Sequence, residues 1–263
     1  MALPHSLLFV PGDRPERFDK AFSSGAGLVI LDLEDAVAPG NKEQARSFIA
    51  RWLDEAKPVA VRINAADTEW FNDDLALCRH PAVAAVMLPK AESADVARHV
   101  RALAPQAAVL PLIETARGFA YAEAIAGAQG VQRLVFGSID FQLDLGIDGD
   151  GGELLFFRSQ LVLASRLAGA AAPIDGVSTA IDDAQALRDD TARARRLGFG
   201  AKLCIHPKQV ATVNAGFALT AEERAWARRV IEAAEQAQGA AAALDGKMID
   251  KPVLLRARAL LAA

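Results

Sequence analysis

Short apolar runs alternate along the chain with longer segments in which apolar residues recur at helical spacing. The runs short enough to be buried strands are residues 5–10, 27–33, 58–63, 84–88, 107–113, 132–137, 174–179 and 200–205. The segments with helical periodicity are residues 14–24, 41–55, 68–79, 93–103, 115–129, 153–169 and 182–197. This alternation predicts parallel strands that are joined by right-handed helical crossovers.

The number of strands distinguishes between two possible folds, a closed barrel and an open doubly wound sheet. Eight strands over about 205 residues agree with a (β/α)8 barrel, which takes about 200–250 residues. An open sheet of this class usually carries a glycine-rich phosphate loop. The sequence has no G-x-G-x-x-G after its first strand and no G-x-x-x-x-G-K-[ST] anywhere. We therefore predict an α/β protein in which residues 1–216 form a (β/α)8 barrel.

The segment after the last predicted strand is helical in pattern and is not needed to close a barrel. Thr220, followed by Glu223, forms a capping box that predicts a helix to about Ala237. A looser stretch leads from there to a final helix that starts near Pro252. We predict that residues 217–263 form a C-terminal helical extension that serves as a lid, as an oligomer contact or as both.

Composition and charge exclude several classes of protein. The formal net charge is −4, whereas a nucleic-acid-binding protein usually presents a basic stripe with interleaved aromatic residues. The first residues lack the basic segment of a secretion signal, and no run of about 18 uncharged apolar residues is present to span a bilayer. Cys78 lies in a helical pattern and Cys204 in a strand-like run, which argues against a disulfide framework. We expect a reduced, cytoplasmic protein without nucleic-acid or membrane partners.

Carboxylates follow the predicted strands at the points where the strands end. Glu114 follows the fifth strand and Asp140 the sixth. The carboxyl ends of barrel strands meet at one rim, so these two side chains are expected to converge there. Two hard oxygen ligands with open water positions suit Mg²⁺ or Mn²⁺. The alternative is that each carboxylate caps the helix that follows it.

Charged residues of both signs surround the ends of the second and third strands. Asp32 and Glu34 share one face of the strand, and Asp35 lies in the loop. They either hold metal-bound waters or form a structural salt-bridge network. Arg62, the one basic residue of the third strand, requires an anion, which is either a carboxylate such as Glu34 or a substrate oxygen. Lys90 offers a further cation at this rim, unless it extends into solvent.

His206 ends the eighth predicted strand and is followed by proline. We interpret it as a strand terminator that is hydrogen-bonded to the backbone rather than as an acid or base. The four histidines and two cysteines show no zinc spacing, and no G-x-S-x-G hydrolase motif is present.

Six segments in chain order resemble the citrate lyase β-subunit and malyl-CoA lyase family. They are Ser6-Leu-Leu-Phe-Val-Pro-Gly-Asp-Arg-Pro-Glu-Arg17, Leu31-Asp-Leu-Glu-Asp-Ala-Val37, Val61-Arg-Ile-Asn64, Leu112-Ile-Glu-Thr-Ala-Arg-Gly118, Ile205-His-Pro-Lys-Gln209 and Asp245-Gly-Lys-Met-Ile-Asp-Lys-Pro252. The resemblance implies a Mg²⁺-dependent TIM barrel. It also implies an enzyme that breaks or forms the carbon–carbon bond between an acyl-thioester enolate and a 2-oxo acid.

The resemblance also implies roles for individual residues. Glu114 and Asp140 resemble the two metal-ligating carboxylates of the family, and Arg62 resembles the arginine that steadies the oxo acid and the developing enolate. Asp250 matches the family's acid/base aspartate, which is carried on a C-terminal lid that reaches the barrel of a neighbouring subunit. Such a lid requires a homo-oligomer, and closed symmetry favours a trimer or a hexamer.

The thioester carrier of such an enzyme requires cationic groups that bind its anionic parts. Arg14, Lys20, Lys42 and Arg46 flank the first two strand ends, although each can instead be an ordinary surface charge. The chain has a shorter tail than malyl-CoA lyases, which leaves open whether the carrier is CoA or an acyl carrier protein.

We therefore expect a Mg²⁺-dependent lyase, or synthase in reverse, that acts on a 3-hydroxyacyl thioester of the citryl, malyl or citramalyl type. One alternative is a metal-dependent aldolase that acts on free 2-oxo acids. Another is a subunit of a citrate lyase complex that is inactive alone.

Overall fold

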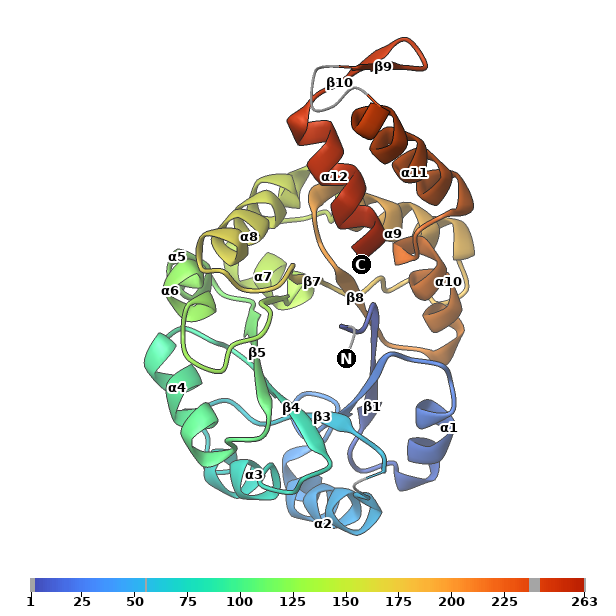
Figure 1. Ribbon diagram of the computed structural model, residues 1–263. Coiled ribbons are helices and arrows are strands. Elements are labelled where there is room, and N and C mark those ends of the chain that lie inside the picture. The colour runs from blue at the N-terminus through green and yellow to red at the C-terminus, as the bar shows by residue number, and fades with distance from the viewer. Residues whose placement is uncertain (1–2, 55, 237–241, 263) are drawn as a thin grey trace. The chain divides into compact units, whose positions relative to one another are not determined.

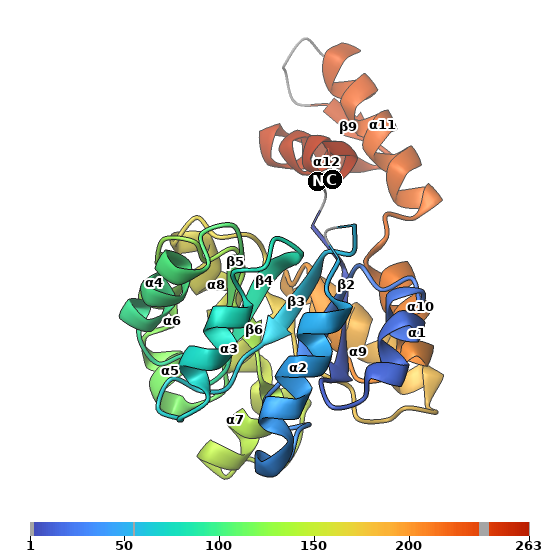
Figure 2. The ribbon, with the colours of Figure 1, turned by 90° about the horizontal axis from the view of Figure 1, so that it is seen from below.

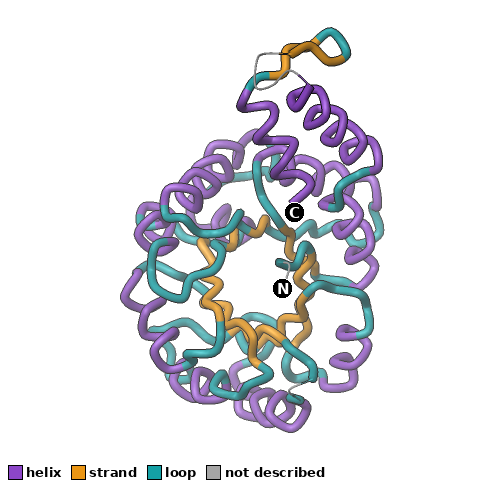
Figure 3. Tube along the Cα trace, in the orientation of Figure 1, coloured by secondary structure: helices purple, strands orange, loops and turns teal. Residues whose placement is uncertain are grey.

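The computed structural model describes residues 3–54, 56–236 and 242–262. The chain divides into two compact units, one of which is Leu3–Phe217 and the other the described part of Ala218–Ala263. The first unit is a ring of strands surrounded by helices (Figure 1), and the strands alone trace a closed ring in Figure 3.

Eight parallel strands close the barrel in chain order, with each strand hydrogen-bonded to the next and β8 to β1. The strands are β1 (Ser6–Pro11), β2 (Leu28–Asp32), β3 (Val59–Arg62), β4 (Val83–Leu88), β5 (Ala108–Ile113), β6 (Val135–Phe136), β7 (Ile174–Asp175) and β8 (Ala201–Cys204). The predicted (β/α)8 barrel is thereby confirmed.

Helices follow each strand on the outside of the ring. They are α1 (Phe18–Phe22), α2 (Lys42–Trp52), α3 (Phe71–Leu77), α4 (Ala94–Leu103), α5 (Ala116–Ala120), α6 (Ala122–Ala126), α7 (Ser138–Leu145), α8 (Leu155–Leu167), α9 (Ala184–Leu197) and α10 (Pro207–Phe217). Short 3-10 helices over Pro15–Arg17, Pro39–Asn41 and Gly152–Leu154 lead into α1, α2 and α8. Helix α7 and the beginning of α2 lie at the same end of the barrel (Figure 2).

Some predicted elements differ from the observed ones. The segment predicted as one helix over residues 115–129 is two short helices that meet at Tyr121, whose φ of −106° and ψ of 11° are not helical. Helix α7 was not predicted, because its first residues continue the apolar run of β6. The strand predicted over residues 174–179 ends at Asp175.

The core consists of two apolar layers that are separated by the strands. Ile30, Ala60 and Leu112 belong to the layer inside the ring, whereas Leu31 and Ile113 belong to the layer between strands and helices. Side chains alternate along a strand, so positions 32, 62 and 114 continue the inward series. The three charged residues of these positions therefore point to the carboxyl-terminal mouth of the barrel.

The second unit pairs two helices and a hairpin: α11 (Ala221–Gln236), β9 (Ala242–Leu244), β10 (Lys247–Ile249) and α12 (Lys251–Ala262). The predicted capping box is confirmed, since Thr220 Oγ1 accepts from the Glu223 N–H at 3.1 Å and Glu223 Oε2 from the Thr220 N–H at 2.9 Å. The hairpin was not predicted. Its turn, Asp245-Gly246, has φ values of 51° and 72°, as a two-residue hairpin turn requires.

Candidate active site

The carboxyl ends of the strands surround a cavity of about 420 Å³. Five residues predicted for the site line it: Asp32, Asp35, Arg62, Glu114 and Asp140. They come from β2, β3, β5 and the start of α7, and apolar side chains such as Phe9 and Leu203 line the rest. The barrel thus brings together polar residues that lie more than a hundred positions apart in sequence.

Arg62 is fixed by carboxylates of the neighbouring strand. Its Nε donates to Asp32 Oδ1 at 2.7 Å and its Nη2 to Asp32 Oδ2 at 2.6 Å, because the two residues are register partners of β3 and β2. The guanidinium carbon lies 4.8 Å from the centre of the Phe9 ring. Burial lowers the pKa of Arg62, but the charges of Asp32 and Glu34 raise it further, so the net shift is upward. The cation is permanent and rigidly oriented.

Glu34 lies beside this ion pair and is only 6% exposed. Its Oε2 is 2.8 Å from Arg62 Nη1, but the geometry of this ion pair is not that of a hydrogen bond. Burial raises the pKa of Glu34 to about 7, with the charges of Asp35 and Asp32 acting in the same direction and Arg62 against them. The ion pairs support the salt-bridge interpretation for Asp32 and Glu34.

Glu114 is 3% exposed, and the backbone N–H of Lys90 donates to its Oε1 at 2.7 Å. Burial raises the pKa of Glu114 to about 8, with the charge of Glu34 and then that of Asp140 adding to the shift. Gly137 leaves the space for this carboxylate, because a Cβ at that position would lie 2.7 Å from Glu114 Oε2. Neither the backbone N–H of Lys90 nor Gly137 was predicted to act on this carboxylate.

Asp140 is half-buried in the first turn of α7. Burial raises its pKa, as does the charge of Asp35, while Arg62 and Lys90 oppose the shift. Among the described residues, neither Asp140 nor Glu114 forms an ion pair with a lysine or arginine. Two carboxylates held at raised pKa against one cavity are suited to an added cation.

The donor set fits a hard divalent cation. Across the described parts of the chain, no group of three or more His, Cys, Asp or Glu residues is arranged to hold a metal ion. Glu114 and Asp140 could supply two oxygen ligands to such a cation, and the other positions would belong to water or substrate oxygens. Mg²⁺ is commonly held in this way, by one or two carboxylates.

Two of the four predicted carrier-binding cations are bonded to buried groups of their own chain. The Lys42 ammonium is buried and donates to the carbonyls of Leu33 and Glu34 at 2.7 and 2.8 Å, which fixes the loop after β2. Arg46 pairs with the buried carboxylate of Asp74 at 2.9 Å. The Lys42 bonds connect α2 to the loop after β2, and the Arg46 pair connects α2 to α3.

The other two cations, Arg14 and Lys20, are exposed. Lys20 lines a second cavity, of about 530 Å³, whose walls are the ends of β1 and β8 and the starts of α1 and α10. Arg17, His206 and Lys208 line the same cavity, so it is basic. These residues were not predicted to line one cavity.

His206 is hydrogen-bonded as predicted for a strand terminator. Its Nδ1 accepts from the Lys208 N–H at 3.1 Å. Gln209 Oε1 accepts from the N–H groups of Ile205 and His206, which holds the start of α10 against β8.

An ionic network outside the ring, in which Arg158, Asp175 and Lys202 are fully buried, was not predicted. Arg158 of α8 donates to Asp175 Oδ1 at 2.9 Å and to Asp150 Oδ1 at 2.6 Å, and Lys202 contacts Asp175 Oδ2 at 3.3 Å. Asp150 belongs to the loop after α7, so the network fixes the helix that carries Asp140 to β7. Lys202 is the sequence feature that could have indicated this network, because it is a lone cation in an apolar strand, as Arg62 is.

Asp250 belongs to the second unit and follows β10. Its Oδ1 accepts from the Val253 N–H at 3.2 Å and so caps the first turn of α12. The carboxylate is half-buried within that unit.

Comparison with known proteins gives consistent matches over the whole chain. The family described as HpcH/HpaI aldolase/citrate lyase matches residues 5–207. A citrate lyase subunit beta-like protein of Deinococcus radiodurans is 38% identical over 99% of this chain and 97% of its own length. A (3S)-malyl-CoA thioesterase of Cereibacter sphaeroides is 33% identical over 98% of this chain and 93% of its own.

A solved structure agrees with these matches. The CitE protein of Mycobacterium tuberculosis, in complex with magnesium, acetoacetate and coenzyme A, superposes with a TM-score of 0.87 at 38% identity. The match covers 99% of this chain and 98% of that one. Among the described residues of this chain, no helix is long and apolar enough to cross a membrane.

Proposed function

The chain belongs to the HpcH/HpaI aldolase/citrate lyase family, and we propose that it is a Mg²⁺-dependent carbon–carbon lyase, or synthase in reverse, acting on a 3-hydroxyacyl thioester. The substrate is of the citryl, malyl or citramalyl type, and the products are an acyl thioester and a 2-oxo acid. One observation carries this proposal: the buried Glu114 and the half-buried Asp140, neither of which pairs with a lysine or arginine among the described residues, line the same cavity as the fixed cation Arg62.

Glu114 and Asp140 would hold the metal ion. Bound Mg²⁺ would polarise the carboxylate and hydroxyl oxygens of the incipient 2-oxo acid and lower the pKa of that hydroxyl. The relative with bound magnesium, acetoacetate and coenzyme A supports this assignment. Mn²⁺ accepts the same hard oxygen ligands.

Arg62 stabilises the charge that develops on the thioester. When the substrate hydroxyl gives its proton to water, its oxygen becomes the keto oxygen of the 2-oxo acid. The carbon–carbon bond then breaks, and the electron pair of that bond moves to the thioester carbonyl, which becomes an enolate. A guanidinium already oriented by Asp32 can stabilise this oxyanion without reorganisation. Asp32 and Glu34 therefore position Arg62, while Asp35 lines the cavity and would hold a metal-bound water.

Asp250 completes the reaction as the proton donor. Its carboxylic acid gives a proton to the enolate carbon in cleavage, and its carboxylate removes that proton in synthesis. We propose that it acts on the barrel of a neighbouring copy within a homo-oligomer, a trimer or a hexamer.

The basic cavity is the proposed site for the anionic part of the thioester carrier. Lys20 lines it together with Arg17 and Lys208, and Arg14 lies in the adjoining loop. Phosphate groups are recognised by such clustered cations. Lys42 and Arg46 would act indirectly, because their bonds to the carbonyl of Leu33 and to Asp74 fix the chain around α2.

A second candidate activity is hydrolysis of the thioester bond. It is favoured by the relative named (3S)-malyl-CoA thioesterase, which matches 98% of this chain. In this reaction water takes the acyl group and a free thiol is released, with no 2-oxo acid formed.

The two activities are separated by measuring both products. The full chain would be incubated with citryl-, malyl- and citramalyl-CoA, with and without Mg²⁺, and the 2-oxo acid and free thiol would be measured separately for the wild type, Glu114→Gln and Asp250→Asn. Metal-dependent release of 2-oxo acid without thiol identifies the lyase, whereas thiol without 2-oxo acid identifies the thioesterase. Turnover of free 2-oxo acids that is indifferent to CoA identifies the aldolase. Inactivity throughout indicates a carrier-protein substrate or a citrate lyase complex subunit.

A further inference from the structure

The two proposed metal ligands, Glu114 and Asp140, lie on segments that are distant in the sequence. Their separation in space decides whether one cation can contact both carboxylates. A backbone hydrogen bond sets part of this separation, because the Gly137 N–H donates to the Ile113 carbonyl at 3.0 Å. This bond joins the two segments just before each ligand.

A side chain joins the same segments just after the ligands. Asp144 lies one turn after Asp140 on α7, so the two carboxylates are on one face of that helix. Asp144 Oδ2 accepts from the Ala116 N–H at 2.7 Å, at the first residue of α5 and two positions after Glu114. The ligand pair is therefore enclosed between a backbone hydrogen bond and the Asp144 hydrogen bond.

The Ala116 N–H requires an acceptor from outside α5, because the first N–H groups of a helix have no carbonyl partner within it. The N-cap side chain does not serve, since Thr115 Oγ1 accepts from the Gly118 N–H at 3.0 Å. The same hydroxyl donates to Glu92 Oε1 at 2.8 Å, which fixes this turn to the loop after β4. Asp144 supplies the acceptor for Ala116 and fixes the turn to α7.

Asp144 is exposed and is not among the described residues that line the cavity. It forms no ion pair with a lysine or arginine in the described parts of the chain. Its carboxylate is therefore not a third ligand, and it can act on a bound metal ion only through the placement of Glu114 and Asp140.

We propose that Asp144 is a positioning residue, whose hydrogen bond to Ala116 holds Glu114 and Asp140 at the separation that one Mg²⁺ ion requires. This inference rests on the proposed function, because it takes the two carboxylates as the metal ligands. Mg²⁺ demands near-ideal octahedral geometry, so its affinity is sensitive to the spacing of its ligands. Loss of a group that orients the ligands of a metal commonly lowers affinity by about 10–100-fold.

Calorimetric titration of the full chain with Mg²⁺ tests this role. Asp144→Ala should bind Mg²⁺ at least about 10-fold more weakly than the wild type. Asp144→Asn loses the charge but keeps an acceptor oxygen for the Ala116 N–H, so its affinity should stay within about 3-fold of the wild type. An Ala variant with wild-type affinity, or an Asn variant as weak as the Ala variant, would overturn the proposal.

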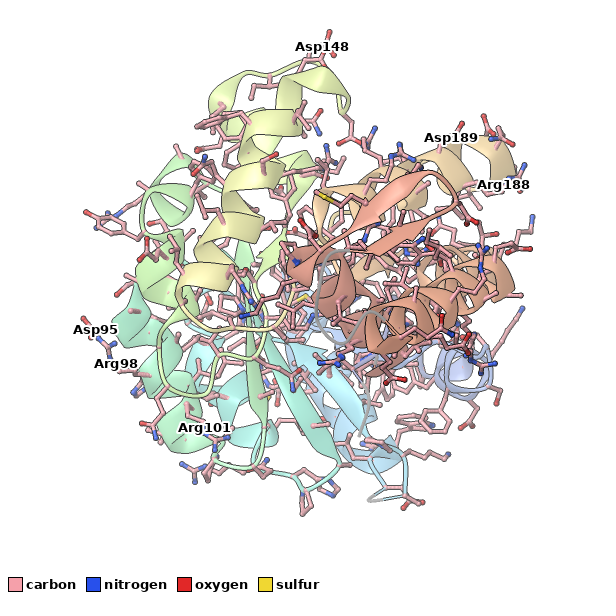
Figure 4. All side chains as sticks on the ribbon, turned by 45° about the horizontal axis from the view of Figure 1, so that its top comes forward. Asp95, Arg98, Arg101, Asp148, Arg188 and Asp189 are labelled. Atoms are coloured by element: carbon pink, nitrogen blue, oxygen red, sulfur yellow. The ribbon has the colours of Figure 1, made fainter. Side chains whose placement is uncertain are left out.

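Two other aspartates serve as matched controls. Asp148 extends from the loop after α7 (Figure 4) and is exposed, so Asp148→Ala measures the loss of a charge near that helix. Asp183 Oδ1 accepts from the N–H groups of Gln185 and Ala186 at the start of α9, so Asp183→Ala measures the loss of a comparable helix-start bond. Both variants should bind Mg²⁺ as the wild type does, and a decrease as large as that of Asp144→Ala would contradict a specific role of Asp144.

Amide hydrogen exchange tests the proposal without a substitution, and so does not depend on whether a variant folds. If the Asp144 hydrogen bond strengthens Mg²⁺ binding, Mg²⁺ must strengthen that bond by the same factor. Exchange of the Ala116 N–H should therefore slow by at least about 10-fold when Mg²⁺ is added, whereas exchange of the Ala186 N–H should not change. An Ala116 N–H that exchanges equally fast in both conditions would refute the role.

Glu114→Gln separates a failure of this inference from a failure of the proposed function. Mg²⁺ binding that is lost in Glu114→Gln but unchanged in Asp144→Ala refutes the positioning role alone. A wild type without affinity for Mg²⁺, or Glu114→Gln with wild-type affinity, refutes the proposed metal site and the positioning role with it.

Discussion

The backbone N–H of Lys90 donates to Glu114 Oε1 at 2.7 Å, and Lys90 adopts a left-handed conformation with φ of 44° to do so. A lysine rarely adopts this conformation, because its Cβ then crowds the backbone. The strain lies at the rim of the candidate metal site, where it orients one oxygen of a proposed ligand. Strained backbone of this kind is commonly kept at functional sites.

This relationship predicts that two substitutions of Lys90 differ in their effect on Mg²⁺ binding. Lys90→Gly removes the strain and keeps the N–H in place, so Mg²⁺ binding should stay within about 3-fold of the wild type. Lys90→Val adds a β-branched side chain at positive φ, which should cost about 1–2 kcal/mol of stability and weaken Mg²⁺ binding by at least about 10-fold. Both variants lose the lysine charge, so calorimetric titration with Mg²⁺ isolates the backbone effect. Equal affinities in the two variants would refute it.

Glu114 predicts how the stability of the metal-free protein depends on pH. Its pKa is raised from 4.5 to about 8 in the folded state, mainly by burial, so the folded chain keeps a proton that the unfolded chain has lost. This contribution to stability is fully present below pH 4.5 and is lost as pH rises to about 8. We expect a lower Tm at pH 8.5 than at pH 6, with the difference reduced in Glu114→Gln.

Mg²⁺ should reverse this dependence, because it favours the ionised carboxylate. The rise in Tm on adding Mg²⁺ should therefore be larger at pH 8.5 than at pH 6, as scanning calorimetry would show. Glu123→Gln, which changes an exposed glutamate of α6, is the control. A Mg²⁺ effect that is equal at both pH values would argue against Glu114 as a ligand.

Gly137 predicts a steric effect on the same carboxylate. A Cβ on this residue would lie 2.5 Å from the Glu114 Cβ, so Gly137→Ala must displace the side chain or the end of β6. We expect a loss of about 1–3 kcal/mol in unfolding free energy, together with weaker Mg²⁺ binding. Gly152→Ala serves as the comparison, since an added Cβ there has no neighbour within 4 Å. Urea unfolding and Mg²⁺ titration of both variants would measure the difference.

The sequence was sufficient for features that depend on local pattern. The apolar runs predicted the strands, and the ends of the fifth and sixth strands placed Glu114 and Asp140 at one rim. The sequence was not sufficient where contacts between distant segments determine the structure. Helix α7 follows an apolar run without a break in pattern, and the partners of Arg158 come from segments that only the folded barrel brings together. Asp250 was identified by resemblance alone, because no periodicity or spacing distinguishes it.

The ion pair of Arg62 and Asp32 predicts a loss of both stability and activity when it is broken. Arg62→Met leaves the carboxylate of Asp32, which is 1% exposed, without its bidentate partner, and breaking a buried pair in this way costs about 3–5 kcal/mol. Arg62→Lys keeps the charge but not the planar fork, so it should recover part of the stability while kcat falls by at least about 100-fold. Arg117→Met is the control, because the Arg117 side chain is 72% exposed and its loss should change stability by less than about 0.5 kcal/mol. Urea unfolding measured beside steady-state kinetics separates the two effects, and a Lys variant with full kcat would show that Arg62 only stabilises the fold.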